Sequence, residues 1–228
     1  MTYFTEPLQN LFTDSRRLIL NFDDIPADTP PAESIASYFE AMTQKGLNPR
    51  LPEHRQQFND QLLASTGKRY LVSQYGEDRR SMLAGSAIAE AGRTIHLGID
   101  IFSKDLEPVL APCDGTIVRV GREPESHSFG NYLILRPANK QLPLVFLGHL
   151  SADLPQPGLV TVGQTIARLG DYHDNENGGW SRHLHLQLLS ELPPEIEVPL
   201  GYSSQQAFAE NSQAYPDPVP YFLDWDLQ

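Results

Sequence analysis

Two histidines separated by a single residue form the stretch of this chain with the clearest chemical potential. In residues 180–188 polar and apolar side chains alternate, so His183, His185 and Gln187 share one face of an extended segment. A period of two predicts a half-buried strand, and side chains two apart on one face lie roughly 7 Å from each other. At that spacing one imidazole could hold a metal ion while the other works beside it. Both could equally be ordinary polar residues of an exposed strand face.

A second alternating stretch, residues 94–101, offers further metal-ligand types. His96, Gly98 and Asp100 share one face, and isoleucine and leucine residues form the other. Gly98 is expected to leave space between the two polar side chains, which an ion or a water molecule could use. Two histidines and one carboxylate with an open coordination position are a hydrolytic zinc arrangement. The two stretches together therefore indicate a metal site more specifically than either does alone.

Two further sets of residues could contribute to such a site. His149 ends a predicted strand, residues 144–149, and could project from the mouth of that strand, although strand ends are commonly polar and exposed. The polar loop 171–180 leads into the His-x-His strand, and loops in this position often shape a substrate groove. The single cysteine, Cys113, is interpreted as a small buried residue and not as a catalytic thiol.

Composition narrows the class of protein. The 228 residues suffice for one large domain, or for a domain with a smaller appendage. A net charge of −12 argues against binding to nucleic acid or to an anionic membrane. With one cysteine, no internal disulfide can form. Residues 1–7 lack the basic start and apolar run of a signal peptide, which predicts a cytoplasmic protein.

The chain divides by pattern into three parts. Residues 1–90 are expected to form a mixed, mostly helical accessory region, 91–192 a β-rich domain, and 193–228 a C-terminal tail packed on the body. In the first part, helical spacing predicts helices over residues 35–46 and from Pro52 to about Ser65, followed by a strand over 69–75. The charged segment 76–80 is interpreted as a solvated turn.

From Arg93 onward the pattern is strand after strand. Glycine and proline separate the candidates at short intervals, and no helical period appears between Phe102 and Leu192. The predicted strands cover residues 94–102, 116–121, 131–136, 144–149, 165–169 and 182–189. This order predicts an all-β domain, either a sandwich or barrel-like.

Four motifs now appear in order along the chain: His96–Leu97–Gly98–Ile99–Asp100, Gly130–Asn131–Tyr132, Gly148–His149–Leu150–Ser151 and His183–Leu184–His185. Together they resemble the lysostaphin-type, LytM-like zinc metallopeptidases of the glycyl-glycine endopeptidase family, over roughly residues 93–189. The resemblance implies a mainly β fold, an antiparallel or barrel-like sheet with a duplicated hybrid motif, around one Zn2+ ion.

The same resemblance implies roles for individual residues. His96, Asp100 and His185 would be the zinc ligands. His149 and His183 would flank the metal-bound water, polarise it and stabilise the oxyanion of the tetrahedral intermediate. Asn131 and Trp180 are expected to contact the substrate.

The loop before the His-x-His strand departs from the usual short run of glycine and serine. It is longer here and resembles that of lysostaphin-type modules fused to class-III aminotransferases, which are intracellular. The resemblance therefore implies a cytoplasmic metalloendopeptidase that hydrolyses a peptide or peptidoglycan-derived bond. The oligomeric state stays open.

Two other functions fit part of the pattern. Two histidines and a carboxylate also form the facial triad of non-haem iron oxygenases, in which His149 and His183 would have no evident role. The fold could also be a non-catalytic binding module that contains zinc, although an open set of three ligands argues against a purely structural ion. In the binding module residues 1–90 would dock a partner, whereas in front of a catalytic domain they could cover the groove as an inhibitory segment.

Overall fold

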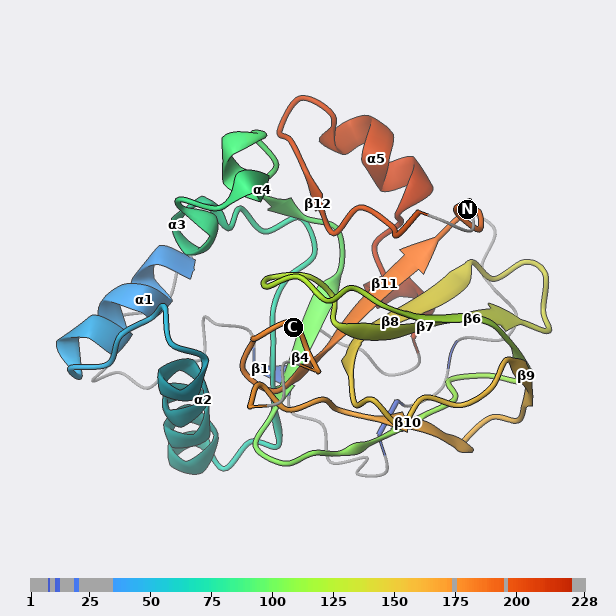
Figure 1. Ribbon diagram of the computed structural model, residues 1–228, viewed down its shortest axis with the longest axis horizontal. Helices are drawn as coiled ribbons and strands as arrows, with labels where there is room; N and C mark the ends of the chain where they lie inside the picture. The colour runs from blue at the N-terminus through green and yellow to red at the C-terminus, as the bar shows by residue number, and fades with distance from the viewer. Residues whose placement is uncertain are drawn as a thin grey trace.

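A sheet of eight strands lies at the centre of the computed structural model, which describes residues 8, 11–12, 19–20, 35–173, 176–194 and 197–222 (Figure 1). In spatial order the strands are β1 (Ile19–Leu20), β2 (Tyr70–Val72), β4 (Ile99–Ser103), β11 (His183–Leu189), β8 (Leu144–Leu150), β7 (Asn131–Pro137), β6 (Gly115–Arg122) and β9 (Gly158–Val160). Neighbouring strands are antiparallel except for the pair β1 and β2. The described strands form an open sheet and do not close into a barrel. The prediction of a mainly β, antiparallel domain is confirmed.

Two small sheets flank the large one. One joins β5 (Pro108–Leu110) to β10 (Thr165–Arg168), and the other joins β3 (Ile95–His96) to β12 (Tyr202–Ser203). The single strand predicted over residues 94–102 is thus two strands, because the chain leaves one sheet after β3 and enters the other at β4. The break falls at Leu97 and Gly98, between the two candidate ligand positions.

Strands β4 and β11 lie side by side in the middle of the sheet, and their register places His185 opposite Asp100 (Figure 1). The alternation in β11 points its leucines into the main core, as expected. All seven residues of β11 are nevertheless buried, so the interpretation of a half-exposed strand is wrong. Helices and loops cover the polar face as well, which places the histidines inside the protein.

The expected helices of the accessory region are present. Helix α1 spans Ile35–Gln44, and α2 spans Pro52–Thr66 and ends at Gly67, whose φ of 66° is a left-handed conformation that glycine adopts without strain. The two helices share a core in which Tyr38 and Met42 of α1 meet Phe58 and Leu62 of α2. Leu71 of β2 belongs to the same core, so this layer packs against the edge of the large sheet.

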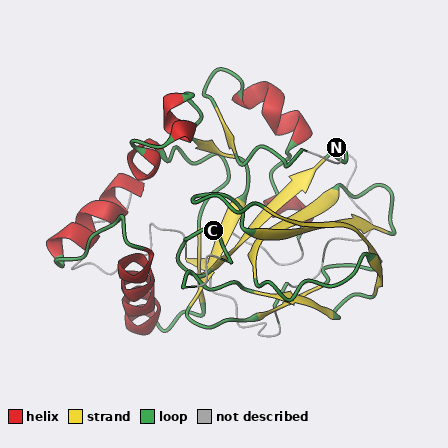
Figure 2. Cartoon of the chain, viewed as in Figure 1, coloured by secondary structure: helices red, strands yellow, loops and turns green. Residues whose placement is uncertain are grey.

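Two short helices follow the turn predicted over residues 76–80, in a stretch for which no element was predicted. They are α3 (Arg80–Leu83) and α4 (Ala87–Glu90). The interpretation of residues 76–80 as a solvated turn is wrong for Arg79, which is 4% exposed. Figure 2 shows the helices of the accessory region to the left and upper left of the strands, and α5 above them.

The described part of the C-terminal segment also contacts the body. It contains β12, helix α5 (Phe208–Ala214) and the 3-10 helix η2 (Val219–Tyr221). The hydroxyl of Tyr75 donates to the carbonyl of Tyr215 at 2.6 Å. Trp225, expected to pack the tail onto the body, lies outside the described residues. No helix in the described part of the chain has the length and apolar character needed to cross a membrane.

Candidate metal centre

Three side chains from three strands converge beside the large sheet and could hold one metal ion: His96, Asp100 and His185. Nε2 of His96 lies 3.1 Å from Nδ1 of His185, and Oδ1 of Asp100 lies 3.0 Å from that Nδ1 and 3.6 Å from that Nε2. Ligand atoms 2.0–2.1 Å from a tetrahedral zinc ion are separated by about 3.3 Å. The three atoms therefore already have the spacing that such an ion requires.

The backbone explains why these residues meet. Antiparallel pairing of β4 with β11 puts Asp100 opposite His185, and the chain bend at Gly98 brings His96 over the same point. A Cβ atom at Gly98 would lie 2.6 Å from Cε1 of His185 and 2.7 Å from the carbonyl oxygen of Leu186. The space expected at Gly98 is therefore filled by the His185 ring and by backbone, so this glycine permits a close approach of two strands.

Gln187 orients the His185 ring. Nε2 of His185 lies 2.9 Å from Oε1 of Gln187, and the amide nitrogen of Gln187 donates to the carbonyl of Leu200 at 2.9 Å. Because that carbonyl can only accept, Oε1 faces the ring and accepts the Nε2 proton. Nδ1 of His185 is then left with a lone pair for a metal ion. The alternation of residues 180–188 had placed Gln187 on the same strand face as His185, but no role was predicted for it. Its position two residues after His185 is the sequence feature that could have indicated this contact.

Arg79 holds the other side of the Asp100 carboxylate. Its guanidinium donates to Oδ2 of Asp100 at 2.6 Å and to the hydroxyl of Ser73 at 2.8 Å. Burial would raise the pKa of Asp100, but the charge of Arg79 beside it, with His96 and His183, holds the pKa well below its usual value. The carboxylate is therefore ionised and fixed. No local pattern in residues 76–80 indicated this contact.

His149 and His183 lie next to the ligand cluster, with ring centroids 4.2 Å apart. Nδ1 of His149 donates to the carbonyl of Asn177 at 2.9 Å, and Nδ1 of His183 donates to the carbonyl of Ser181 at 2.7 Å. Both Nε2 atoms therefore keep a lone pair that can accept a proton. Nε2 of His183 lies 3.7 Å from Oδ1 of Asp100.

Burial keeps this pair of imidazoles neutral. Desolvation lowers the pKa of His183 to about 4, against opposing contributions from Asp100 and the Ser181 carbonyl. Desolvation, with the nearby His183 and His185, also lowers the pKa of His149 well below its usual value. Both rings can therefore act as bases at neutral pH.

Hydrogen bonds to its backbone hold His149 in an uncommon conformation. Its φ of 62° is in the left-handed region, which costs a residue other than glycine about 1–3 kcal/mol. Its N–H donates to the carbonyl of Phe129 and its carbonyl accepts from Gly170, both at 2.8 Å. His149 was expected to project from the end of its strand through regular alternation. Its left-handed backbone interrupts that alternation, and its ring lies against that of His183.

The loop before β11 is organised by a buried asparagine that the sequence pattern did not single out. Oδ1 of Asn177 accepts from the N–H groups of Gly179 and Trp180, and its Nδ2 donates to the carbonyl of Trp180 at 2.7 Å. The Asn177 carbonyl also accepts from His149, so one residue shapes the loop and orients a histidine of the site. His173, in the same loop, is exposed.

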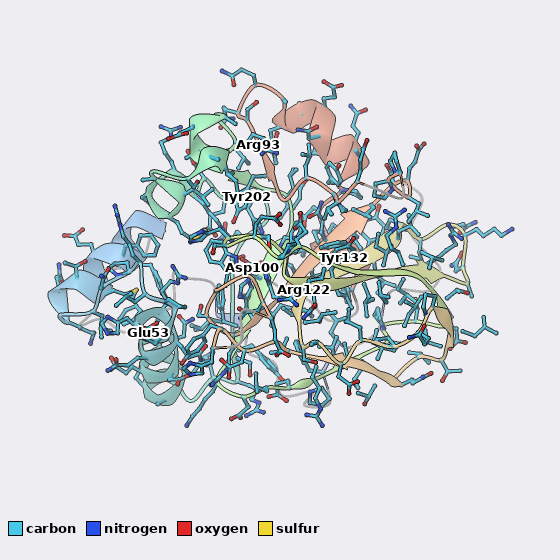
Figure 3. All side chains as sticks on the ribbon, in the orientation of Figure 1. Glu53, Arg93, Asp100, Arg122, Tyr132 and Tyr202 are labelled. Carbon is cyan, nitrogen blue, oxygen red and sulfur yellow. The ribbon has the colours of Figure 1, made fainter. Side chains whose placement is uncertain are left out.

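The two expected substrate contacts have different environments. Trp180 lines a cavity of about 390 Å³ that also contains His96, Asp100, His149, His183 and His185. Asn131 is not among the residues that line it. Its side-chain amide is buried and donates to the carbonyl of Leu150 at 3.2 Å, so it joins the end of β7 to the end of β8. Figure 3 shows Asp100 near the middle of the molecule, with Tyr202 above it.

Comparison with known proteins agrees with this site. Residues 94–194 match the model of Peptidase family M23. A comparison with curated proteins found no match.

Among solved structures, a zinc-containing peptidase from Vibrio cholerae is 30% identical, with a TM-score of 0.35 over 42% of this chain and 27% of that one. The catalytic domain of lysostaphin from Staphylococcus simulans is 23% identical, with a TM-score of 0.37 over 51% and 80%. The catalytic domain of the M23 protein EnpA from Enterococcus faecalis is 21% identical, with a TM-score of 0.37 over 48% and 75%.

The described fold and site define the class of domain: an antiparallel β domain with a His-Asp-His cluster that can bind a metal ion. Residues 94–194 match the model of Peptidase family M23, and all three candidate ligands, together with His149 and His183, lie within the matched segment. The chain spans 27% of the length of the Vibrio cholerae peptidase.

Proposed function

We propose that this protein is a zinc-dependent peptidase that hydrolyses a peptide or amide bond in a peptide or peptidoglycan-derived substrate. The observation that carries the proposal is the spacing of 3.0–3.6 Å among Nε2 of His96, Oδ1 of Asp100 and Nδ1 of His185, in a domain of a peptidase family. A cytoplasmic location for the protein remains a prediction from the sequence.

The donor set fits zinc. Two imidazole nitrogens and one carboxylate leave a fourth tetrahedral position open, as in hydrolytic zinc sites. Bound in that site, the ion would supply a water of pKa near 7 and would polarise a substrate carbonyl. Gln187 and Arg79 orient two of the three ligands. Among the described residues, Nδ1 of His96 has no hydrogen-bond partner, and the centre of its ring lies 5.5 Å from that of Tyr202.

His149 and His183 supply the proton transfers. Each has Nδ1–H bonded to a backbone carbonyl, so Nε2 of one ring can take a proton from the attacking water. That ring then becomes a donor, able to stabilise negative charge on the carbonyl oxygen and to protonate the leaving amine. Burial of both rings excludes bulk water that would compete for these protons.

The test separates metal binding from chemistry. In Asp100→Ala and His185→Ala we expect loss of zinc, measured by elemental analysis of protein purified without a metal-affinity tag. His149→Ala should keep zinc and lose hydrolysis of peptides and muropeptides by about 10²-fold or more. His173→Ala, which changes an exposed histidine of the neighbouring loop, is the matched control and should change neither.

Full activity in His149→Ala on a cleaved substrate would refute the role given to that residue. Iron in the purified protein, together with oxygen consumption, would favour an oxygenase. Failure to take up any metal on zinc titration would favour a binding module.

A further inference from the structure

The cavity beside the metal centre is lined by the accessory region as well as by residues 94–194, the segment that matches Peptidase family M23 (the M23 segment). Tyr38 and Phe39 of α1, Arg55 of α2 and Met82 of α3 line it together with the histidines. Further aromatic or aliphatic residues in its wall are Ile88, Phe102, Phe129, Trp180, Val198 and Leu200. The charged groups that line it are Arg55, Arg79, Arg93, Asp100, Glu123 and Glu125. Arg79 is paired with Asp100.

Arg55 is a buried cation that forms no ion pair in the part of the chain that the structure describes, and the Glu53 carboxylate acts on it only from beyond ion-pair distance. It is 7% exposed, and its terminal nitrogens donate to the carbonyls of Pro49 at 3.0 Å and Gly179 at 3.4 Å. Its Nε has no hydrogen-bond partner among the residues that the structure describes. Burial lowers the pKa of Arg55, but a guanidinium remains protonated in proteins. A buried charge without a counter-ion is costly, and an anionic ligand would remove that cost.

The guanidinium lies over Trp180, with its carbon 5.2 Å from the centre of the indole ring. The His149 ring is 6.4 Å from the same indole. One aromatic side chain therefore lies between Arg55 and the histidines of the site. Together the two distances put the guanidinium carbon within about 12 Å of the His149 ring, which at about 3.3–3.6 Å per extended residue is a span of three residues or fewer.

The neighbour of Arg55 fixes its position relative to the ligand strands. Gln56 is 3% exposed, and its amide donates to the carbonyl of Ser103 at the end of β4 at 3.2 Å. Its oxygen accepts from the N–H of Arg182, directly before β11, at 2.7 Å. These two hydrogen bonds connect α2 to both strands that carry Asp100 and His185. Arg55 therefore has a fixed place beside the centre.

We propose that Arg55 makes this cavity a subsite for a carboxylate of the substrate, next to an apolar wall that receives an aromatic or aliphatic side chain. The inference rests on the peptidase function proposed above and names its substrate class: short peptides that carry a carboxylate within about three residues of the scissile bond. The carboxylate could be a chain terminus or an acidic side chain, since the guanidinium can pair with either in the same bidentate way.

The test measures binding and cleavage separately on the full zinc-loaded chain. Calorimetry would compare N-acetyl-Ala-Ala-Phe with a free C-terminal carboxylate, the same peptide as an amide, and N-acetyl-Ala-Ala-Phe-Asp-amide. Mass spectrometry of the same mixtures reports cleavage. We expect at least one of the two carboxylate peptides to bind about tenfold or more tightly than the neutral amide. Which of them is preferred identifies the source of the carboxylate.

Variants assign the preference to Arg55. In Arg55→Gln the ratio of the affinity for the carboxylate peptide to that for the amide should fall to about one. Arg55→Lys should keep part of the preference for the carboxylate. Arg50→Gln, an exposed arginine five residues earlier, makes the same change of charge and should leave the ratio unaltered. Each ratio compares two peptides on the same variant. Partial unfolding of that variant affects both peptides alike and therefore leaves the ratio unchanged.

Three outcomes would overturn the subsite. They are an unchanged ratio in Arg55→Gln, equal affinity of the wild-type chain for all three peptides, and no binding of any of them at millimolar concentration. Cleavage of the peptides with equal affinities would leave the peptidase proposal standing and remove only the subsite. Binding that prefers the carboxylate without any cleavage would support the subsite and count against the peptidase proposal.

Discussion

Arg79 and Asp100 form a buried ion pair in which the guanidinium donates to Oδ2 at 2.6 Å, while Oδ1 of the same carboxylate faces the imidazoles of the candidate metal centre. Both side chains are about 95% buried or more. The pair connects the loop before α3 to strand β4, so a residue outside the M23 segment holds a ligand inside it. The accessory region is therefore part of the site.

Removing Arg79 should destabilise the metal-free protein strongly. Arg79→Leu leaves the buried Asp100 carboxylate without its cation, which costs about 3–5 kcal/mol in the free energy of unfolding. Zinc should restore part of this loss because the ion compensates the same charge. Chemical denaturation with and without zinc measures both effects. Arg80→Leu is the control, since that exposed pair with Asp78 should contribute no more than about 1 kcal/mol. Equal losses in the two variants would contradict the role of Arg79.

Gln187 should set the affinity of the site for metal. Gln187→Leu removes the acceptor that fixes the His185 ring, and we expect zinc to bind about 10- to 100-fold more weakly. Competition against a chelator of known affinity measures the change. Gln141→Leu, at an exposed position, should bind zinc as the wild type does. An unchanged zinc affinity in Gln187→Leu would show that the ring is oriented by other contacts.

The close approach at Gly98 predicts a large effect from one methyl group. Gly98→Ala would place a carbon 2.6–2.7 Å from the His185 ring and the Leu186 carbonyl, and the backbone cannot move away without disturbing β11. We expect a loss of about 1–3 kcal/mol in the free energy of unfolding together with weaker zinc binding. Gly158→Ala meets its nearest atom at 3.9 Å and should change stability by no more than about 0.5 kcal/mol. Tolerance of Gly98→Ala would mean that the strands can separate there.

His183 should make the metal-free protein sensitive to mild acid. Its pKa is about 4 in the folded chain and near 6.5 when unfolded, so between these values the unfolded state binds more protons. The stability that His183 contributes is complete above pH 6.5 and falls by up to about 1.4 kcal/mol per unit as the pH drops toward 4. Denaturation at pH 7, 6 and 5 measures the slope, and His183→Gln should lower it. Parallel slopes in the two proteins would contradict the low pKa.

The local pattern of the chain was sufficient for much of the framework. Alternation placed His183, His185 and Gln187 on one strand face, because a pleated strand turns successive side chains to opposite sides. Helical spacing and the terminating Gly67 located α2 within about one residue. These features depend on neighbours in sequence, so the sequence alone determines them.

Tertiary structure decided which of those faces meet and what covers them. The pairing of β4 with β11 sets Asp100 against His185, and the accessory helices bury the face that was expected to be half exposed. Arg79 and Arg55 reach the site from segments with no local sign of a functional role. The physical reason is that an ion pair or a cavity wall depends on the packing of elements far apart in the chain, which the period of a single segment does not record.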